Sequence, residues 1–330
     1  MGNSTSKPTF YAGVDLGGTK IMTGVFDAEL QLIGFTKITT KAHRGPEAVI
    51  HRIVRCIEDA VDDCDLAMDQ IKAIGIGAPG GVDPESGRVI FAPNLDWKNV
   101  GLKAVLEERL KIPVAVENDC NICTLGVHEK EFECKPQHLL GIYIGTGIGG
   151  GLILGGKLYS GFNRTAGEVG HMVIDVNGPM CGCGNQGCFE AFASRTALFN
   201  RIRAAVKAGE KTVLTDLFGP ELSDLRSRGL RKAIRRNDKL VESLVKEAAT
   251  YAGIAVGNLI NILNPEVVVL GGGIIEALDD EMMPIITKVA KDHVLSGTGK
   301  GVDITATQLA DNAGIFGGGV LARRMLKEKR

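Results

Sequence analysis

The sequence predicts an α/β protein made of two related domains that face each other across a cleft. Glycine is abundant, with 44 residues, whereas aromatic residues make up only 5% of the chain, a balance typical of α/β proteins with tight turns around ligand-binding loops. A strand, a glycine turn and a second strand occur twice, as GVDLGGTKIMTGVF at 13–26 and as GIYIGTGIGGGLIL at 141–154. The length of 330 residues also suits about two domains, at roughly 100–200 residues each.

The charge balance argues against a polyanionic partner. The 38 basic and 39 acidic residues give a net charge of -1, so we expect neither nucleic acid nor a membrane as a partner. No segment has the ~18 consecutive apolar residues of a membrane span, and the polar start MGNSTSKPTF lacks the apolar core of a signal peptide. We therefore expect a cytoplasmic protein. The first six residues fit the N-myristoylation pattern at Gly2, although a polar tail is their expected role.

The smaller domain is expected to comprise residues 1–117 and a C-terminal helix at 308–330. Its strands should be joined first by the turn Gly17-Gly18-Thr19. Apolar residues then recur at helical spacing between 49 and 60. In chain order, strands are expected at 11–16, 21–26, 31–40, 72–77 and 114–117.

The larger domain is expected at 118–307, with a hinge near Glu117 to Asp119. A strand at 139–144 should enter a glycine hairpin at 145–151, from which a strand at 152–154 leaves. The other elements expected in the second half are helices at 195–208 and 240–263, a buried strand at 266–270, a turn at 271–273 and a helix at 313–329. The last of these ends in Lys and Arg, as a helix C-terminus favours.

Three glycine turns are candidate phosphate sites. Glycine permits the sharp turn that lets several backbone N–H groups converge on one anion. None of them is a Walker A loop, because the Gly-Lys-Ser/Thr ending is absent, and each alone could be an ordinary hairpin turn. Their occurrence together favours polyphosphate binding. The candidate residues are Asp15, Gly17, Gly18, Thr19, Lys20, Gly145, Thr146, Gly147, Gly271, Gly272 and Gly273.

One cluster of cysteines predicts a metal site. His171, Cys181, Cys183 and Cys188 provide four ligands of the kind that zinc prefers, the complement of a closed tetrahedral site. Glycines between the cysteines allow the chain to fold sharply around one ion. Because no position is left for water, the zinc should be structural. The other cysteines are expected to be small packing residues.

The chain resembles the ROK family of sugar kinases, which have the actin-like, hexokinase-type (ribonuclease H-like) ATPase fold. The resemblance runs from Tyr11 to about Ala322 and implies transfer of phosphate from ATP, with Mg²⁺, to the 6-hydroxyl of a hexose, expected to be glucose. The motifs that carry it are DLGGTK at 15–20, GAPGGVDPESG at 77–87, NLDW at 94–97, ENDCN at 117–121, IGTGIGGG at 144–151, GEVGH at 167–171 and CGCGNQGCFE at 181–190.

The resemblance also implies roles for single residues. Asp119 would be the general base that takes the proton of the sugar hydroxyl, although an aspartate at a helix start can also simply cap the helix. Asp15 would order the magnesium or accept a hydrogen bond within the first turn. The structural zinc would fix the sugar-binding residues near it. The sugar-binding residues implied are Gly80, Gly81, Asn94, Asn118, Asp119, Glu168, His171 and Glu190.

Several alternatives stay open at this point. A kinase of N-acetylglucosamine, N-acetylmannosamine, fructose or allose would share these motifs. A catalytically silent sugar sensor is the non-enzyme alternative, and a dehydrogenase using GTGIGG at 145–150 is a further one. A DNA-binding repressor of the family is not expected, because the first strand begins near Tyr11. Exposed helices in the second domain make a homodimer or a higher homo-oligomer plausible.

Overall fold

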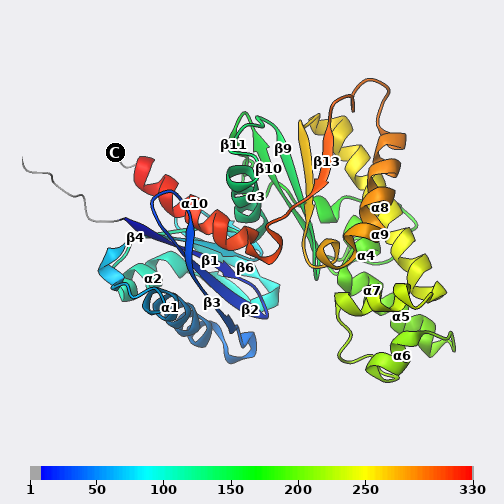
Figure 1. Cartoon of the computed structure of the whole chain (residues 1–330), viewed down its shortest axis with the longest axis horizontal. Coiled ribbons are helices and arrows are strands. Elements are labelled where there is room, and N and C mark those ends of the chain that lie inside the picture. Colours follow the sequence, from blue (N-terminus) through cyan, green and yellow to red (C-terminus); the bar gives the residue numbers. More distant parts are fainter. Residues whose placement is uncertain (1–8, 329–330) are drawn as a thin grey trace, which may run out of the picture. The chain divides into compact units, whose positions relative to one another are not determined.

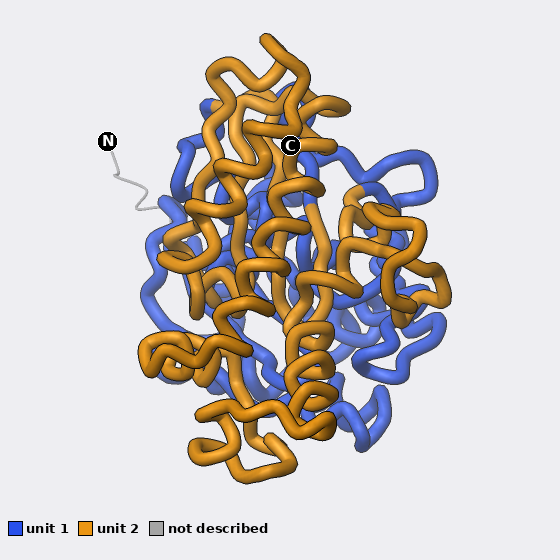
Figure 2. Tube along the Cα trace, turned by 90° about the vertical axis from the view of Figure 1, so that its right-hand side faces the viewer, with its two compact units in different colours: residues 1–135, 151–166, 312–330 blue, residues 136–150, 167–311 orange. Residues whose placement is uncertain are grey.

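The computed structural model describes residues 9–328, which form two compact units (Figures 1 and 2). The first unit comprises residues 1–135, 151–166 and 312–330, and the second comprises 136–150 and 167–311. The myristoylation pattern at Gly2 lies outside the described residues. Within the described range, no helix combines the length and the apolar character needed to cross a membrane.

The first five-stranded sheet has the order β3-β2-β1-β4-β8. β1 pairs antiparallel with β2 and parallel with β4, which in turn pairs parallel with β8. Each strand predicted in this half is present, within two residues at either end. The strands are β1 (Phe10–Leu16), β2 (Lys20–Phe26), β3 (Leu32–Thr39), β4 (Ile71–Ala78) and β8 (Val114–Asn118).

The second five-stranded sheet repeats this order, as β11-β10-β9-β12-β13. β12 pairs parallel with both β9 and β13, and β10 pairs antiparallel with β11. The predicted internal repeat is therefore confirmed. The second glycine turn is shorter than the predicted 145–151, because Gly149 to Gly151 already lie in β10. The strands are β9 (Leu139–Ile144), β10 (Ile148–Leu154), β11 (Lys157–Leu158), β12 (Val267–Gly271) and β13 (Asp303–Ala306).

A third sheet was not predicted. Its three short strands, β5 (Gly81–Asp83), β6 (Arg88–Ala92) and β7 (Trp97–Val100), are antiparallel neighbours in the order β5-β6-β7. Strands of three to five residues provide too little alternation to be recognised in a sequence. This sheet carries the segment that contains Gly80 to Asn94.

Helices cover both faces of the first sheet. Residues of α1 pack with Ala12, Val14 and Leu16 of β1, whereas Tyr11 and Ala73 pack with residues of α10 on the other face (Figure 1). The helices are α1 (Pro46–Asp62), α2 (Leu102–Leu110), α3 (Asp119–Lys130), α4 (Phe189–Ala193), α5 (Arg195–Lys207), α6 (Val213–Phe218), α7 (Ser227–Arg235), α8 (Lys239–Leu263), α9 (Ile275–His293) and α10 (Ala313–Glu328).

Glycines let α10 approach the sheet and α3 closely. A Cβ atom on Gly13 would lie 2.0 Å from the carbonyl oxygen of Ile315, and one on Gly317 would lie 1.7 Å from that of Ile122. Larger residues would therefore force the backbones apart. Because α3 packs on α10 in this way, it belongs to the first compact unit, whereas we expected the domain boundary just before it, at 117–118.

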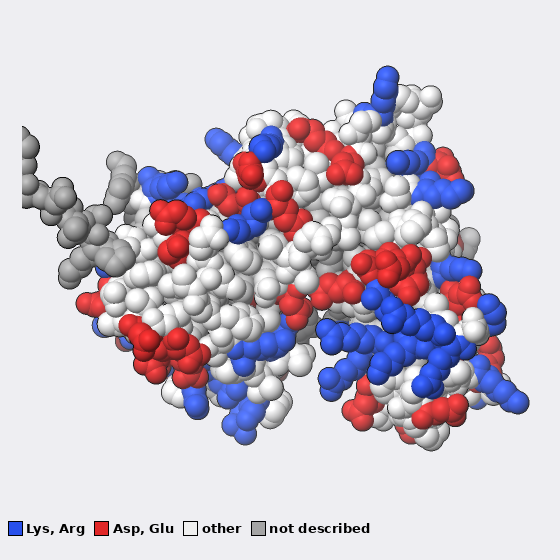
Figure 3. Space-filling view, viewed as in Figure 1, with Lys and Arg blue, Asp and Glu red and all other residues white. Residues whose placement is uncertain are grey.

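The charges are distributed unevenly over the second unit. Lys and Arg side chains gather over the region of α5 to α7 (Figure 3), a surface that we call the basic surface. Its members on and beside α7 include Arg226, Arg228, Lys232, Arg235 and Arg236, which are all exposed. The balanced net charge of the chain thus conceals a locally cationic region.

Candidate active site

The junction of β8 and α3 carries the predicted catalytic residue. Asn118 is the N-cap of α3, and its Oδ1 accepts hydrogen bonds from the backbone N–H groups of Cys120 (2.9 Å) and Asn121 (3.1 Å). Asp119 is the first helical residue, and its Oδ1 lies 2.8 Å from the N–H of Cys120. The cap that we considered for Asp119 is therefore provided by Asn118.

Two of the predicted sugar-binding residues meet at this junction. The Nδ2 of Asn118 donates a hydrogen bond to the carbonyl oxygen of Gly80, at 3.0 Å. Gly80 has a φ of +81°, and a Cβ atom there would lie 2.1 Å from the carbonyl oxygen of Phe91. Only glycine meets both requirements without strain. Gly81 follows as the first residue of β5, against the ring of Phe91.

The first glycine turn lies beside another predicted sugar-binding residue. Gly17 N–H donates to the carbonyl oxygen of Lys20 at 2.9 Å, which closes the turn, and the buried Thr40 donates its hydroxyl to Gly17 O at 2.6 Å. A Cβ atom on Gly18 would lie 3.1 Å from the Cβ of Asn94. Asp15 is half-buried near the end of β1, with the start of α10 against it, because a Cβ atom on Gly314 would lie 2.8 Å from its Cγ.

Glu117 is a buried carboxyl group that sequence analysis did not select. Its Oε1 accepts hydrogen bonds from the backbone N–H of Asn118 (2.8 Å) and from Nδ2 of Asn121 (3.0 Å). Burial raises the pKa of this carboxyl group, and the two donors oppose that shift. Glu117 thus fixes the backbone on which Asn118 and Asp119 stand. An acidic residue at the end of the otherwise apolar strand VAVE was the signal available in the sequence.

In the second unit the structure brings two glycine turns together. Gly145 to Gly147 follow β9, and Gly271 ends β12 and leads into Gly272 and Gly273; the two strands are parallel neighbours. Gly272 has a φ of +87°, and its Cβ position would lie 2.6 Å from the carbonyl oxygen of Ile144. Ile274 N–H also donates to that oxygen, at 3.0 Å. The carboxyl ends of adjacent parallel strands therefore present both turns at the same edge of the sheet, a common place for ligand binding in α/β proteins.

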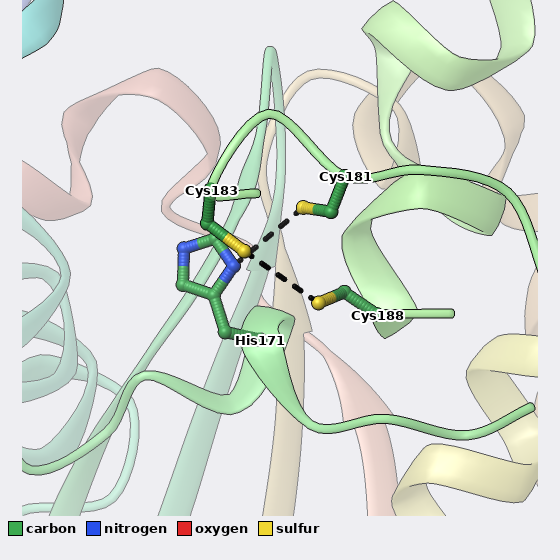
Figure 4. Close-up of side chains that lie close together, drawn as sticks. All are labelled: His171, Cys181, Cys183 and Cys188. Carbon is green, nitrogen blue, oxygen red and sulfur yellow. Dashed lines mark hydrogen bonds between the residues drawn. The ribbon is translucent and has the colours of Figure 1, made fainter. Parts of the chain in front are cut away.

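The four predicted metal ligands converge (Figure 4). Their ligand atoms all lie within 4.8 Å of one another. Nδ1 of His171 is 3.7 Å from Sγ of Cys181, and Sγ of Cys183 is 3.7 Å from Sγ of Cys188. Tetrahedral ligands at about 2.0–2.3 Å from a zinc ion lie roughly 3.5–3.8 Å apart. The donor set and its spacing therefore fit one zinc ion.

The loop that carries the cysteines is held by short backbone contacts. Met180 bridges to Gln186, and Val173 bridges to Cys188, which is also the N-cap of α4. Burial raises the pKa of the Cys188 thiol to about 12, whereas the backbone hydrogen bond at Asn185 lowers the pKa of the exposed Cys183. Cys188 and Cys183 therefore lie in unequal environments, the first buried and the second exposed.

The predicted sugar-binding residues of this unit lie around the cluster. His171 turns Nδ1 toward Cys181, and its Nε2 is 4.0 Å from a carboxylate oxygen of Glu168. Glu190 connects the cluster to a glycine turn. Its Oε2 accepts the N–H of Ile148 at 2.8 Å, and its Oε1 is 3.8 Å from Sγ of Cys181. One carboxylate oxygen of Glu190, which the resemblance implies for the sugar, thus also holds the start of β10.

Known proteins are similar to this chain over nearly its whole length. The family model described as ROK family matches residues 11–325. A glucokinase of Thermotoga maritima is 35% identical over 96% of this chain and 97% of its own length. The xylose repressor of Bacillus subtilis is 29% identical over 94% of this chain and 76% of the repressor.

A solved structure extends this similarity to the fold. The crystal structure of a ROK family glucokinase from Streptomyces griseus, in complex with glucose and AMPPNP, has a TM-score of 0.83 and 32% identity, over 96% of this chain and 99% of that chain. The prediction of the actin-like, hexokinase-type fold is confirmed by this similarity and by the repeated strand order. The chain belongs to the ROK family.

Proposed function

We propose that this protein is an ATP-dependent hexose kinase that phosphorylates glucose at its 6-hydroxyl. The observation that carries the proposal is its similarity, over nearly its whole length, to glucokinases, one of which is described with glucose and the ATP analogue AMPPNP. Asp119, Asn118, Glu168 and His171, which the resemblance implies for the sugar, are all present.

In the proposed mechanism, the residues of this chain mainly position groups and move one proton. Asp119 accepts the proton of the sugar hydroxyl as that oxygen attacks the γ-phosphorus of ATP. Asn118 binds the sugar while its side chain stays tied to Gly80 O. The glycine turns would bind the phosphates, and Asp15 would hold Mg²⁺, whose chemistry would be to neutralise the phosphate charge.

The proposed cofactor of the cysteine cluster is a structural zinc ion. His171, Cys181, Cys183 and Cys188 would fill all four positions, so that the ion stabilises the loop and takes no part in the reaction. Holding His171 through Nδ1 would leave its Nε2 facing Glu168, 4.0 Å from a carboxylate oxygen of that residue. Ligand orientation by such neighbouring carboxylates is common at metal-bound histidines.

We place the enzyme in the cytoplasm, where ATP is available and thiols stay reduced. Glucose 6-phosphate would enter glycolysis. The protein would act as a homodimer or a higher homo-oligomer, which light scattering of the purified protein would test.

A panel of sugars tests the acceptor. Initial rates with ATP would be compared for glucose, N-acetylglucosamine, N-acetylmannosamine, fructose and allose at equal concentrations. We expect kcat/KM to be highest for glucose. A higher value for an N-acetyl sugar would reassign the acceptor, and no turnover with any sugar, combined with measurable sugar binding, would favour a sensor.

A further inference from the structure

The two glycine turns of the second unit contain no positively charged side chain. Residues 139–151, LLGIYIGTGIGGG, and residues 267–275, VVVLGGGII, include neither Lys nor Arg. Phosphate sites in proteins usually combine backbone N–H groups with a cationic side chain, as the P-loop lysine illustrates. If these turns bind the phosphates of ATP, a cation from elsewhere in the fold is expected beside them.

Arg195, the first residue of α5, is that cation. Its Nη2 donates a hydrogen bond to Oγ1 of Thr146, and its backbone N–H donates to the carbonyl oxygen of Gly145 at 2.9 Å. Its side chain is partly exposed. Among the ion pairs found within the described residues, none involves Arg195, whereas Arg201 of the same helix pairs with Glu247. A guanidinium group has five N–H donors, and most of those of Arg195 remain available.

The contacts of α5 also orient the turn itself. The backbone N–H of Arg195 donates a hydrogen bond to the carbonyl oxygen of Gly145. In addition, the hydroxyl group of Thr196 donates one to the carbonyl oxygen of Thr146, at 2.7 Å. Both carbonyl groups therefore face α5. Because a trans peptide directs its N–H opposite to its C=O, the N–H groups of Thr146 and Gly147 point away from α5, as an anion site requires.

The hydrogen bond from Arg195 has a second effect, on the hydroxyl group of Thr146. Since Oγ1 of Thr146 accepts a hydrogen bond from the guanidinium group, its own proton stays free to be donated to another acceptor. Arginine also forms strong, directional hydrogen bonds to phosphate oxygens. Arg195 can thus contribute a positive charge and also orient the hydroxyl group of Thr146 as a donor.

We propose that Arg195 is a nucleotide-binding residue whose guanidinium group binds the phosphate chain of ATP beyond the α-phosphate, next to the turn at Thr146. This inference rests on the proposed function and identifies a residue that completes the phosphate site of the second unit. It assigns to Arg195 a role in ATP binding and none in sugar binding.

The test compares Arg195→Gln and Arg195→Lys with the wild type. Both variants keep the backbone contact to Gly145, so the turn stays anchored and only the guanidinium is changed. Arg235→Gln is the matched control, because Arg235 is an exposed arginine of the same unit within the basic surface. Dissociation constants of Mg·ATP, ADP and AMP would be measured by calorimetry, together with the melting temperature and the KM for glucose.

We expect Arg195→Gln to weaken ATP binding by about 10–100-fold, the contribution of a charge-assisted hydrogen bond. ADP should show a similar loss, AMP little change, and Arg195→Lys a smaller loss. The glucose KM should stay within about twofold, and Arg235→Gln should bind ATP like the wild type. Unchanged ATP affinity, equal losses for ATP and AMP, or an equal loss in Arg235→Gln would overturn the inference.

These binding measurements separate the inference from the proposed function. If the wild type binds ATP but phosphorylates no sugar, the proposed function fails while the comparison of variants still tests Arg195. If the wild type phosphorylates glucose and Arg195→Gln binds ATP normally, the inference fails alone.

Discussion

Replacing Asp119 by Asn removes the proposed proton acceptor with little other change. The side chain keeps its size, and its Oδ1 can still lie near the N–H of Cys120. The N-cap of α3 is unaffected, because Asn118 provides both capping hydrogen bonds. The variant therefore separates a catalytic role of Asp119 from a purely structural one.

The two roles predict effects of very different size. A carboxylate in the first turn of a helix contributes about 0.3–1 kcal/mol through the helix dipole, which corresponds to a fall in Tm of roughly 1–4 °C for a domain of about 150–250 residues. Loss of a general base lowers kcat by about 10²–10⁴-fold, or roughly 3–5 kcal/mol in activation free energy. A catalytic Asp119 thus predicts a large loss of rate beside a small loss of stability.

The assay would measure kcat by coupled spectrophotometry, binding of glucose and ATP by calorimetry, and Tm by circular dichroism. Asp216→Asn is the matched control, because Asp216 is an exposed aspartate in the first turn of α6. We expect Asp119→Asn to bind both substrates and to turn over at most about one hundredth as fast as the wild type. A folded Asp119→Asn variant with near-normal kcat would refute the mechanism.

Two further changes test the zinc site and the sugar site. Cys183→Ser should reduce zinc from about one ion per chain to almost none and lower the Tm markedly, because structural zinc contributes folding free energy. Metal analysis would show this loss, with Cys64→Ser as the control. A zinc-free wild type of equal stability would contradict the prediction. Glu168→Gln should raise the KM for glucose by about 10–100-fold, through loss of a charge-assisted hydrogen bond, and leave the KM for ATP nearly unchanged. Steady-state kinetics would measure both KM values. Equal effects on both substrates would indicate general misfolding instead.

Local pattern was sufficient to predict the repeated part of the fold. β1 and β9 are apolar strands that end in glycine turns, and β2 is an apolar strand that follows one, so their type and these ends could be read from the sequence. The helix α9 was not predicted, and it contains both Pro284 and a deviation from helical geometry at Leu278. The short strands β5 to β7 were missed because pairing between segments, rather than periodicity, defines them.

The candidate site also has a part that local sequence patterns could predict and a part that depends on contacts between distant segments. The ligands of the metal cluster lie within one segment of the sequence, from His171 to Cys188, so their residue types, together with the family resemblance, could predict the convergence that the structure has. The contact of Arg195 with Thr146 joins residues 49 positions apart, and it depends on how α5 packs on the turn. No local pattern could indicate such a contact, nor that Asn118 rather than Asp119 caps α3.

The most direct test of the proposed function is the identity of the product formed from glucose and Mg·ATP. The reaction would be followed by coupling to glucose-6-phosphate dehydrogenase, which responds only to the 6-phosphate, and the phosphorylated carbon would be verified by ³¹P NMR. We predict one glucose 6-phosphate for each ATP consumed, and almost none from Asp119→Asn. Consumption of ATP without glucose 6-phosphate, or no consumption at saturating glucose, would contradict the assignment as a glucose kinase.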